Sequence, residues 1–214
     1  MKLPCRFAAM CFSVIWGLSF ASTPDLAVGS TFEFPIDVAE SFLNGVSNLG
    51  QNPETVIDLA TIDATPGEIL MFEVLGEFSL SGLETPSNPN IATAAIGVFS
   101  GSSTLLAFDQ AAVIERVVDA IDAGVDIDTS PSQDIAEDFA LGGSFPGGLS
   151  VEDVAVEVPI GATHLFVSAF DGFFLDNSDA DSNFAVRITV VPEPGSLALL
   201  GVGAIGCMLL QRNR

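Results

Sequence analysis

The oxygen-bearing residues after position 170 of this 214-residue chain could hold a metal ion. Asp171 follows an alternating apolar stretch, and Asp176 and Asn177 lie a few positions further along. Carboxylate and amide oxygens, helped by a main-chain carbonyl such as that of Leu175, are the ligands that Ca²⁺ takes at about 2.3–2.6 Å. We therefore predict one calcium site at Asp171, Leu175, Asp176 and Asn177. The alternative is a solvated hairpin, because turn geometry alone favours Asp and Asn.

The remaining acidic residues give weaker signals. Residues 176–181 alternate acids as an EF-hand loop does, but they lack its central glycine and its closing glutamate. Four further aspartates are expected to form a solvated acidic face: Asp119, Asp122, Asp126 and Asp128. The whole chain has 28 acidic and 6 basic residues, a formal net charge of −22. This charge argues against nucleic-acid binding, which depends on cationic side chains.

The residue types present offer little for catalysis. His164 is the only histidine and has no nucleophile-elbow sequence near it, so a Ser-His-Asp triad is not expected. Residues 22–192 lack cysteine and lysine, which removes cysteine nucleophiles, zinc–cysteine sites and Schiff-base chemistry. They also lack tryptophan and tyrosine, the aromatic side chains with a polar group that suit sugar stacking. We predict a non-catalytic protein; a secreted glycoside hydrolase with a carboxylate pair is an alternative.

The N-terminal segment has the layout of an export signal. Lys2 and Arg6 precede an uncharged apolar stretch at residues 7–20, and small residues at 19 and 21 suit a signal peptidase. We predict a signal peptide at residues 1–21, which leaves residues 22–190 as the exported domain. Because the cysteines lie at positions 5, 11 and 207, that domain is expected to fold without disulfides.

The C-terminal segment has the layout of a second processing signal. Pro192, Glu193 and Pro194 precede an apolar stretch at residues 197–210, and Arg212 and Arg214 close the chain. As a helix, residues 195–210 would span about 24 Å of a hydrocarbon core about 30 Å thick. The arginines favour an orientation with the basic end in the cytoplasm. We predict a transient membrane anchor.

Residues 191–214, together with the N-terminal signal, closely resemble the PEP-CTERM sorting signal of Gram-negative bacteria. The Pro-Glu-Pro triplet, the short hydrophobic stretch and the terminal arginines carry the resemblance. It implies processing near the triplet by exosortase, a membrane protease, after export across the inner membrane. The destination is then the cell surface or the medium. A plain single-pass tail anchor is the alternative.

The exported domain is dominated by short stretches of alternating polar and apolar residues. They lie at residues 30–34, 68–72, 77–80, 154–158, 164–170 and 183–191. A period of two with Pro and Gly between the stretches is typical of half-buried antiparallel strands. We therefore predict a mainly β fold, an antiparallel β-sandwich, with a core filled by phenylalanine.

One inserted helix is expected within this sandwich. Asp109 could cap it, Val113, Val117 and Ile121 would form its apolar stripe, and Gly124 would end it. A helical turn at residues 134–141 and a flexible glycine-rich connector at residues 142–148 are also predicted.

Residues 158–190 resemble the end of many PEP-CTERM ectodomains and, more distantly, the calcium loop of bacterial galactose-binding lectins with a jelly-roll fold. The resemblance implies that Asp171 opens the loop, the Leu175 carbonyl contributes from its middle, and Asp176 and Asn177 close it. Two departures concern sugar binding: an acidic insertion follows Ser178, and no tyrosine is available as a ligand.

Together these features predict an exported, exosortase-processed, strongly acidic protein of the cell surface or the extracellular, exopolysaccharide-rich biofilm matrix. Its negative charge would attract divalent cations, so calcium could link the protein to anionic polysaccharide. A calcium-dependent carbohydrate-binding module and the secreted hydrolase are the two alternatives.

Overall fold

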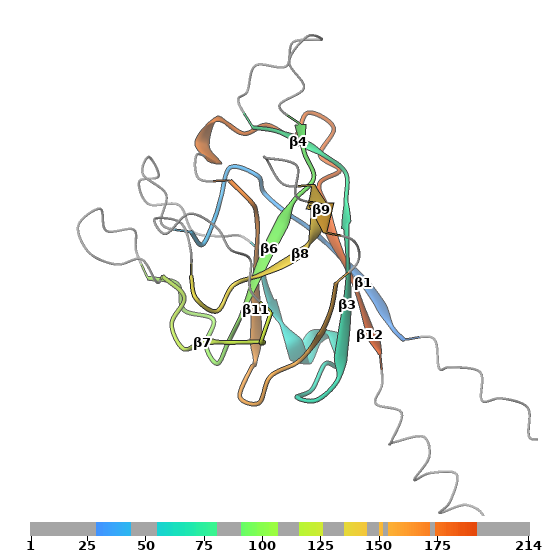
Figure 1. Ribbon diagram of the computed structural model, residues 1–214, viewed down its shortest axis with the longest axis vertical. Helices are drawn as coiled ribbons and strands as arrows, with labels where there is room; N and C mark the ends of the chain where they lie inside the picture. The colour runs from blue at the N-terminus through green and yellow to red at the C-terminus, as the bar shows by residue number, and fades with distance from the viewer. Residues whose placement is uncertain are drawn as a thin grey trace, which may run out of the picture.

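The computed structural model describes residues 29–43, 55–80, 91–106, 116–125, 135–144, 150–151, 154–171 and 174–191. These residues form a mainly β body in which two antiparallel sheets lie face to face (Figure 1). The layered arrangement agrees with the expected sandwich. The predicted signal peptide, the residues of the Pro-Glu-Pro triplet and the C-terminal apolar segment lie outside the described residues.

The first sheet contains the last strand of the body between two neighbours. Its order is β1 (Thr31–Pro35), β12 (Ala185–Val191), β3 (Ile69–Leu75) and β10 (Val154–Glu157). Thr31 faces Thr189 across one ladder, and Ile69 faces Val191 across the next. Residues that are far apart in the sequence therefore close this sheet.

The second sheet has β2 (Val56–Asp58) at one edge, followed by β11 (His164–Ala169), β6 (Ala95–Ser100), β8 (Phe139–Ser144) and β9 (Ser150–Val151). The short β7 (Ala120–Ile121) also pairs with β6. A separate ribbon joins β4 (Phe78–Ser79) to β5 (Ile91–Ala92). Two short 3₁₀ helices complete the body, η1 (Leu59–Ile62) and η2 (Phe174–Asp176).

Alternating burial in the first sheet places its apolar side chains against the second sheet. On β12, Val186, Ile188 and Val190 are buried, while the residues between them are half-buried. Phenylalanine fills much of the interior: the Phe99 and Phe139 rings stack with centroids 5.3 Å apart, and Phe72 lies 5.9 Å from Phe139. Burial of such rings away from water supplies the main stabilisation of a core without tryptophan.

All six alternating stretches predicted as strands contain strand residues in the structure, as β1, β3, β4, β10, β11 and β12. The strand β6 gave no alternating signal because every one of its residues is buried. A second apolar cluster that includes Phe42 and Leu43 covers its outer face. A strand buried on both faces has a continuous apolar sequence, which does not distinguish strand from helix.

The predicted inserted helix is wrong over its described half. Val117 forms an isolated β-bridge with Leu105, and Ala120–Ile121 are strand β7 beside β6. Asp119 adopts a left-handed backbone with φ 54°, which interrupts any helix there. Valine and isoleucine are β-branched and favour extended backbone, and pairing with β6 outweighs their helical spacing. Residues 107–115 lie outside the described residues, and no α-helix occurs in the described ones.

The predictions for residues 134–148 also need correction. A single turn occurs, in which the Asp138 N–H donates to the Ile135 carbonyl at 2.9 Å, and β8 begins directly after it. Gly142 and Gly143 belong to β8 rather than to a connector. Gly143 has φ +97°, and a Cβ there would lie 1.9 Å from the Thr93 carbonyl oxygen. Glycine is required because β8 passes close to the neighbouring backbone.

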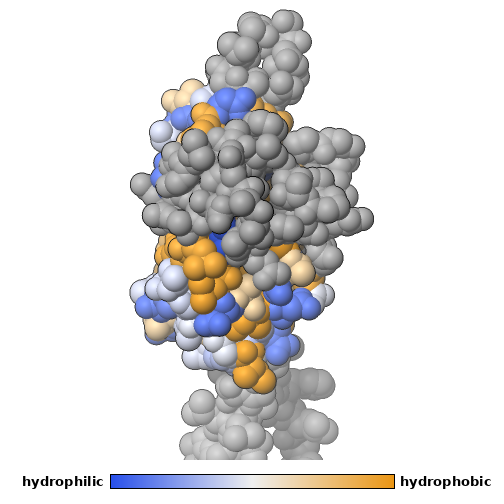
Figure 2. Space-filling model, turned by 90° about the vertical axis from the view of Figure 1, so that its left-hand side faces the viewer, coloured by the Kyte–Doolittle hydropathy of each residue, from blue (hydrophilic) through white to orange (hydrophobic). Residues whose placement is uncertain are grey.

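The surface keeps several large apolar side chains among hydrophilic ones, and Figure 2 shows this mixture on one face. Ile160 is 91% exposed, far more than any other large hydrophobic residue among those described. Ile69, Met71 and Leu175 are exposed by 39%, 44% and 49%. No described segment is an apolar helix of the length needed to cross a membrane.

Replacing Gly143 by alanine tests the close approach of β8. Gly143→Ala should lower the free energy of unfolding by about 3 kcal/mol or more, because it adds overpacking to left-handed backbone strain. Gly124→Ala is the matched control: φ is +73° and nothing lies within 4 Å of its Cβ position. Strain alone should cost it about 1 kcal/mol. Equal losses in urea unfolding of the two variants would contradict this explanation.

Candidate functional site

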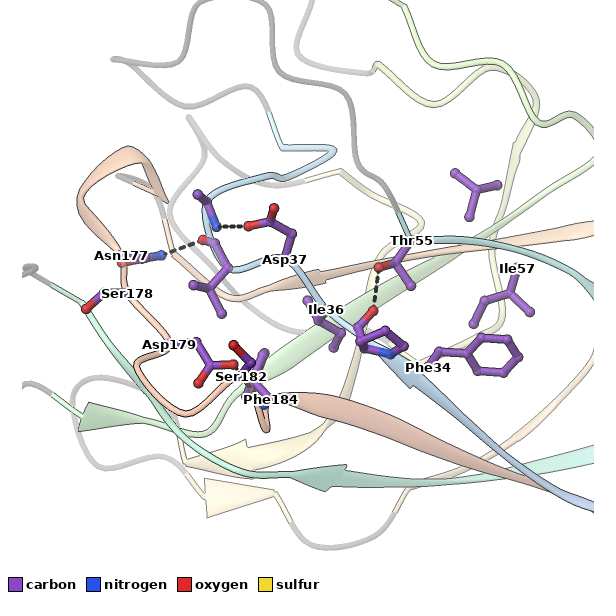
Figure 3. Close-up of a pocket in the computed structure, with 14 residues that line it drawn as sticks. Phe34, Ile36, Asp37, Thr55, Ile57, Asn177, Ser178, Asp179, Ser182 and Phe184 are labelled. Atoms are coloured by element: carbon purple, nitrogen blue, oxygen red, sulfur yellow. Dashed lines mark hydrogen bonds between the residues drawn. The ribbon is translucent and has the colours of Figure 1, made fainter.

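A pocket of about 560 Å³ opens between the edge strands of the two sheets, β1 and β2 (Figure 3). The Thr55 hydroxyl donates to the Pro35 carbonyl at 2.9 Å and thereby joins the two edges. Three segments line the pocket: residues 34–39, 55–57, and parts of 177–184. Residues from both ends of the body sequence thus build one concave site.

The turn after β1 forms one wall of the pocket. The Asp37 carboxylate accepts a hydrogen bond from the Ala39 N–H at 2.9 Å, the local bond that favours Asp in turns. The Ile36 N–H donates to the Phe184 carbonyl at 3.0 Å, which holds the turn against the start of β12. The Asp37 side chain is therefore part of both the turn and the lining.

The acidic insertion after Ser178 forms a closed loop rather than an extended one. The Asp179 carboxylate accepts hydrogen bonds from the main-chain N–H groups of Asn183 and Phe184 at 3.4 and 3.0 Å. The Asn183 side chain donates to Asp181 at 2.7 Å. Ser178 exchanges two main-chain hydrogen bonds with Ser79 of β4, at 2.9 and 3.0 Å. These bonds fix the second wall of the pocket.

Asn177 connects the predicted calcium loop with the pocket. Its side chain is buried, and its Nδ2 donates to the Val38 carbonyl at 3.0 Å (Figure 3). Its Oδ1 is also buried but has no hydrogen-bond partner. A buried acceptor without a donor costs about 1–3 kcal/mol, so the arrangement is suited to a group that would satisfy this oxygen.

The other predicted calcium ligands lie in the same loop between β11 and β12. Leu175 and Asp176 are exposed on η2, and Asp171 is partly buried, two residues after the end of β11. Among the described residues, no three His, Cys, Asp or Glu side chains are grouped closely enough to hold a metal ion. The predicted site also uses an amide and a carbonyl oxygen, and it stays a prediction.

The pocket lining has acidic and neutral polar groups and contains no Lys, Arg or His. The two arginines of residues 22–192 are engaged elsewhere. Arg187 donates to Glu73 at 2.7 Å and to Glu33 at 3.4 Å across the first sheet, and the hydrogen bond and charge of Glu73 raise the pKa of Arg187. Arg116 donates to the carbonyls of Leu106 and Ser41, and burial lowers the pKa of Arg116.

The chemistry of the pocket follows from this lining. Carboxylates of Asp37 and Asp179, the Asn177 amide and the hydroxyls of Ser178 and Ser182 lie beside apolar walls that include Phe34. Such a site favours a cation or a neutral ligand rich in hydroxyl or amine donors, and it disfavours an anion. His164 is not part of it: this residue opens β11, and its Nδ1 lies 2.8 Å from the Thr163 hydroxyl.

Residues 190–214 match the PEP-CTERM protein-sorting motif. The match supports the resemblance found in the sequence, and the motif implies an exported protein that exosortase processes and that reaches the cell surface or the medium. No curated protein and no solved structure matches the chain. The resemblance of residues 158–190 to galactose-binding lectins stays a prediction.

Removing the Asp179 carboxylate tests how the second wall is held. Asp179→Ala should lower the free energy of unfolding by about 2 kcal/mol, because two main-chain N–H groups lose a charged acceptor. Asp181→Ala is the control, since Asp181 accepts only a side-chain bond in an exposed position. It should cost about 0.5 kcal/mol. Urea unfolding in which the control loses as much as Asp179→Ala would refute this role.

Proposed function

We propose that the mature protein is a non-catalytic component of the cell surface or of the extracellular matrix. Its C-terminal apolar segment holds it transiently in the membrane until exosortase cuts near Pro192, Glu193 and Pro194. The match of residues 190–214 to the sorting motif supports the processing step. The apolar stretch at 197–210 and the closing Arg212 and Arg214 support the anchoring step.

We further propose that the loop between β11 and β12 binds calcium. Asp171, Asp176, Asn177 and the Leu175 carbonyl would supply the oxygen ligands. The observation that carries the proposal is the buried Asn177 Oδ1 without a hydrogen-bond partner. A hard cation would satisfy this oxygen, and two carboxylates of the same loop would balance its charge. The ion would join η2 to the turn after β1 through Asn177.

A calcium-dependent carbohydrate-binding module is the second candidate, and the pocket favours it. Its volume falls in the range of small-molecule sites, roughly 300–1,000 Å³. Sugar hydroxyls could donate to the carboxylate and amide oxygens of the lining, while Phe34 offers an apolar wall. Because Asn177 lines the pocket and belongs to the predicted calcium loop, the two binding events would be coupled.

Calcium should raise the melting temperature of the protein. Binding to the folded state alone stabilises it by about 2.7 kcal/mol when the free ion is a hundredfold above its dissociation constant. The increase should disappear in Asp176→Asn, whose exposed side chain can change without disturbing the core. Glu157→Gln, on exposed β10 surface, is the control and should keep the increase. Identical wild-type melting curves with calcium and with chelator would exclude the ion site.

Retention on extracellular polysaccharide tests the second candidate. The wild type should be retained in calcium and elute with chelator, and Asp37→Asn should weaken retention about tenfold through loss of one charged acceptor. Asp122→Asn is the matched control because Asp122 makes the same kind of turn bond, to the Gly124 N–H at 2.6 Å. Unchanged retention of Asp37→Asn would remove the pocket from sugar binding. Shortening of the polymer would instead support the hydrolase.

A further inference from the structure

The chain leaves the body at one end of the first sheet, and a neighbouring strand ends there too. β10 and β12 are both antiparallel to β3, so they run in the same direction (Figure 1). Val191 and Glu157 pair with the same residue, Ile69, on opposite sides of β3. The sorting motif begins at residue 190, inside β12. The ends of β10 and β12 therefore lie side by side with Ile69, at the same end of the first sheet.

The turn after β10 projects further in that direction. The Val158 N–H donates to the Glu68 carbonyl at 2.8 Å, and the Gly67 N–H donates to the Val158 carbonyl at 2.9 Å. A further bond from the Ala162 N–H to the Pro159 carbonyl closes the turn at 3.1 Å. Ile160 lies within this turn and is 91% exposed. The bonds hold the apolar side chain in solvent.

Other apolar groups share this end of the body. Ile69 and Met71 are exposed on β3, and Val191 lies half-buried opposite Ile69. Together with Ile160 they form what we name the basal face. A single exposed isoleucine is ordinary, but this group, with the exposed Glu157 paired to Ile69, lies on the β3 side of the point where the chain departs.

We infer that the basal face rests on the lipid surface while the C-terminal segment is in the membrane, with Ile160 at the boundary between headgroups and acyl chains. The inference rests on the anchoring step proposed above. From Val191 to Gly195 the chain can reach at most about 14 Å. The headgroup layer is about 5–8 Å thick, so Val191 lies no more than about 9 Å outside it.

The short length of the apolar segment at residues 195–210 would bring the body closer to the lipid surface. Residues 195–210 would span about 24 Å as a helix, less than the hydrocarbon thickness, and a short span draws its flanking residues into the interface. A second copy of the chain is a poor alternative occupant, because both copies carry a net charge of −22 and repel each other. Because the chain is acidic, an anionic lipid surface would repel it, so a zwitterionic surface is the expected partner.

A tryptophan at position 160 tests this contact directly. Residues 22–192 contain no tryptophan or tyrosine, so Ile160→Trp in the full chain with Trp16→Phe reports on one position only. Ile91→Trp in the same background is the control, since Ile91 is 48% exposed on β5, which pairs with β4 at the opposite end of the body (Figure 1). Each variant is floated with phosphatidylcholine vesicles that contain acyl-brominated lipid.

We expect Ile160→Trp to show a blue-shifted emission that the brominated lipid quenches, while Ile91→Trp stays water-exposed. Vesicle partition should also weaken about tenfold in Ile160→Ser and stay unchanged in Ile91→Ser. Flotation with a water-exposed tryptophan at 160 would overturn the basal contact and leave the anchoring step intact. Failure of all variants to float would overturn the anchoring step and, with it, the basal contact.

Discussion

The hydrogen-bond ladders on both sides of β12 are the interaction on which the rest of the structure depends. β12 pairs with β1 and with β3 and buries Val186, Ile188 and Val190. The loop that enters this strand forms one wall of the pocket, and the chain that leaves it enters the sorting motif. The pocket and the sorting motif are thus set at opposite ends of one strand.

This placement separates the pocket from the sorting motif along the axis of the body. At the far end, Asn177 donates to the Val38 carbonyl and Asp179 accepts from the Phe184 N–H, and both residues line the pocket. At the near end, only three residues separate Val191 from the start of the segment at 195–210. A cut at the sorting motif would therefore leave the pocket undisturbed.

The strands with one solvent face could be predicted because alternation is a local property of the sequence. β6 and β8 could not, since β6 is buried on both faces and the glycines of β8 are typical of a loop until the nearby Thr93 backbone is known. The helical spacing of Val117 and Ile121 predicted a helix, but Ile121 forms strand β7, which pairs with β6. Asn177 was predicted as a calcium ligand from its residue type. Its hydrogen bond to the Val38 carbonyl could not be predicted, because it joins residues 139 positions apart in the sequence.

The intact mass of the protein recovered from outside the cell tests the central claim most directly. If the sorting motif is processed where β12 ends, the mature chain should stop between Pro192 and Gly195, with every residue of β12 retained. Because the ladders of β12 hold the body together, a cut within the strand is not expected. A mass that still includes Arg214 would contradict the account.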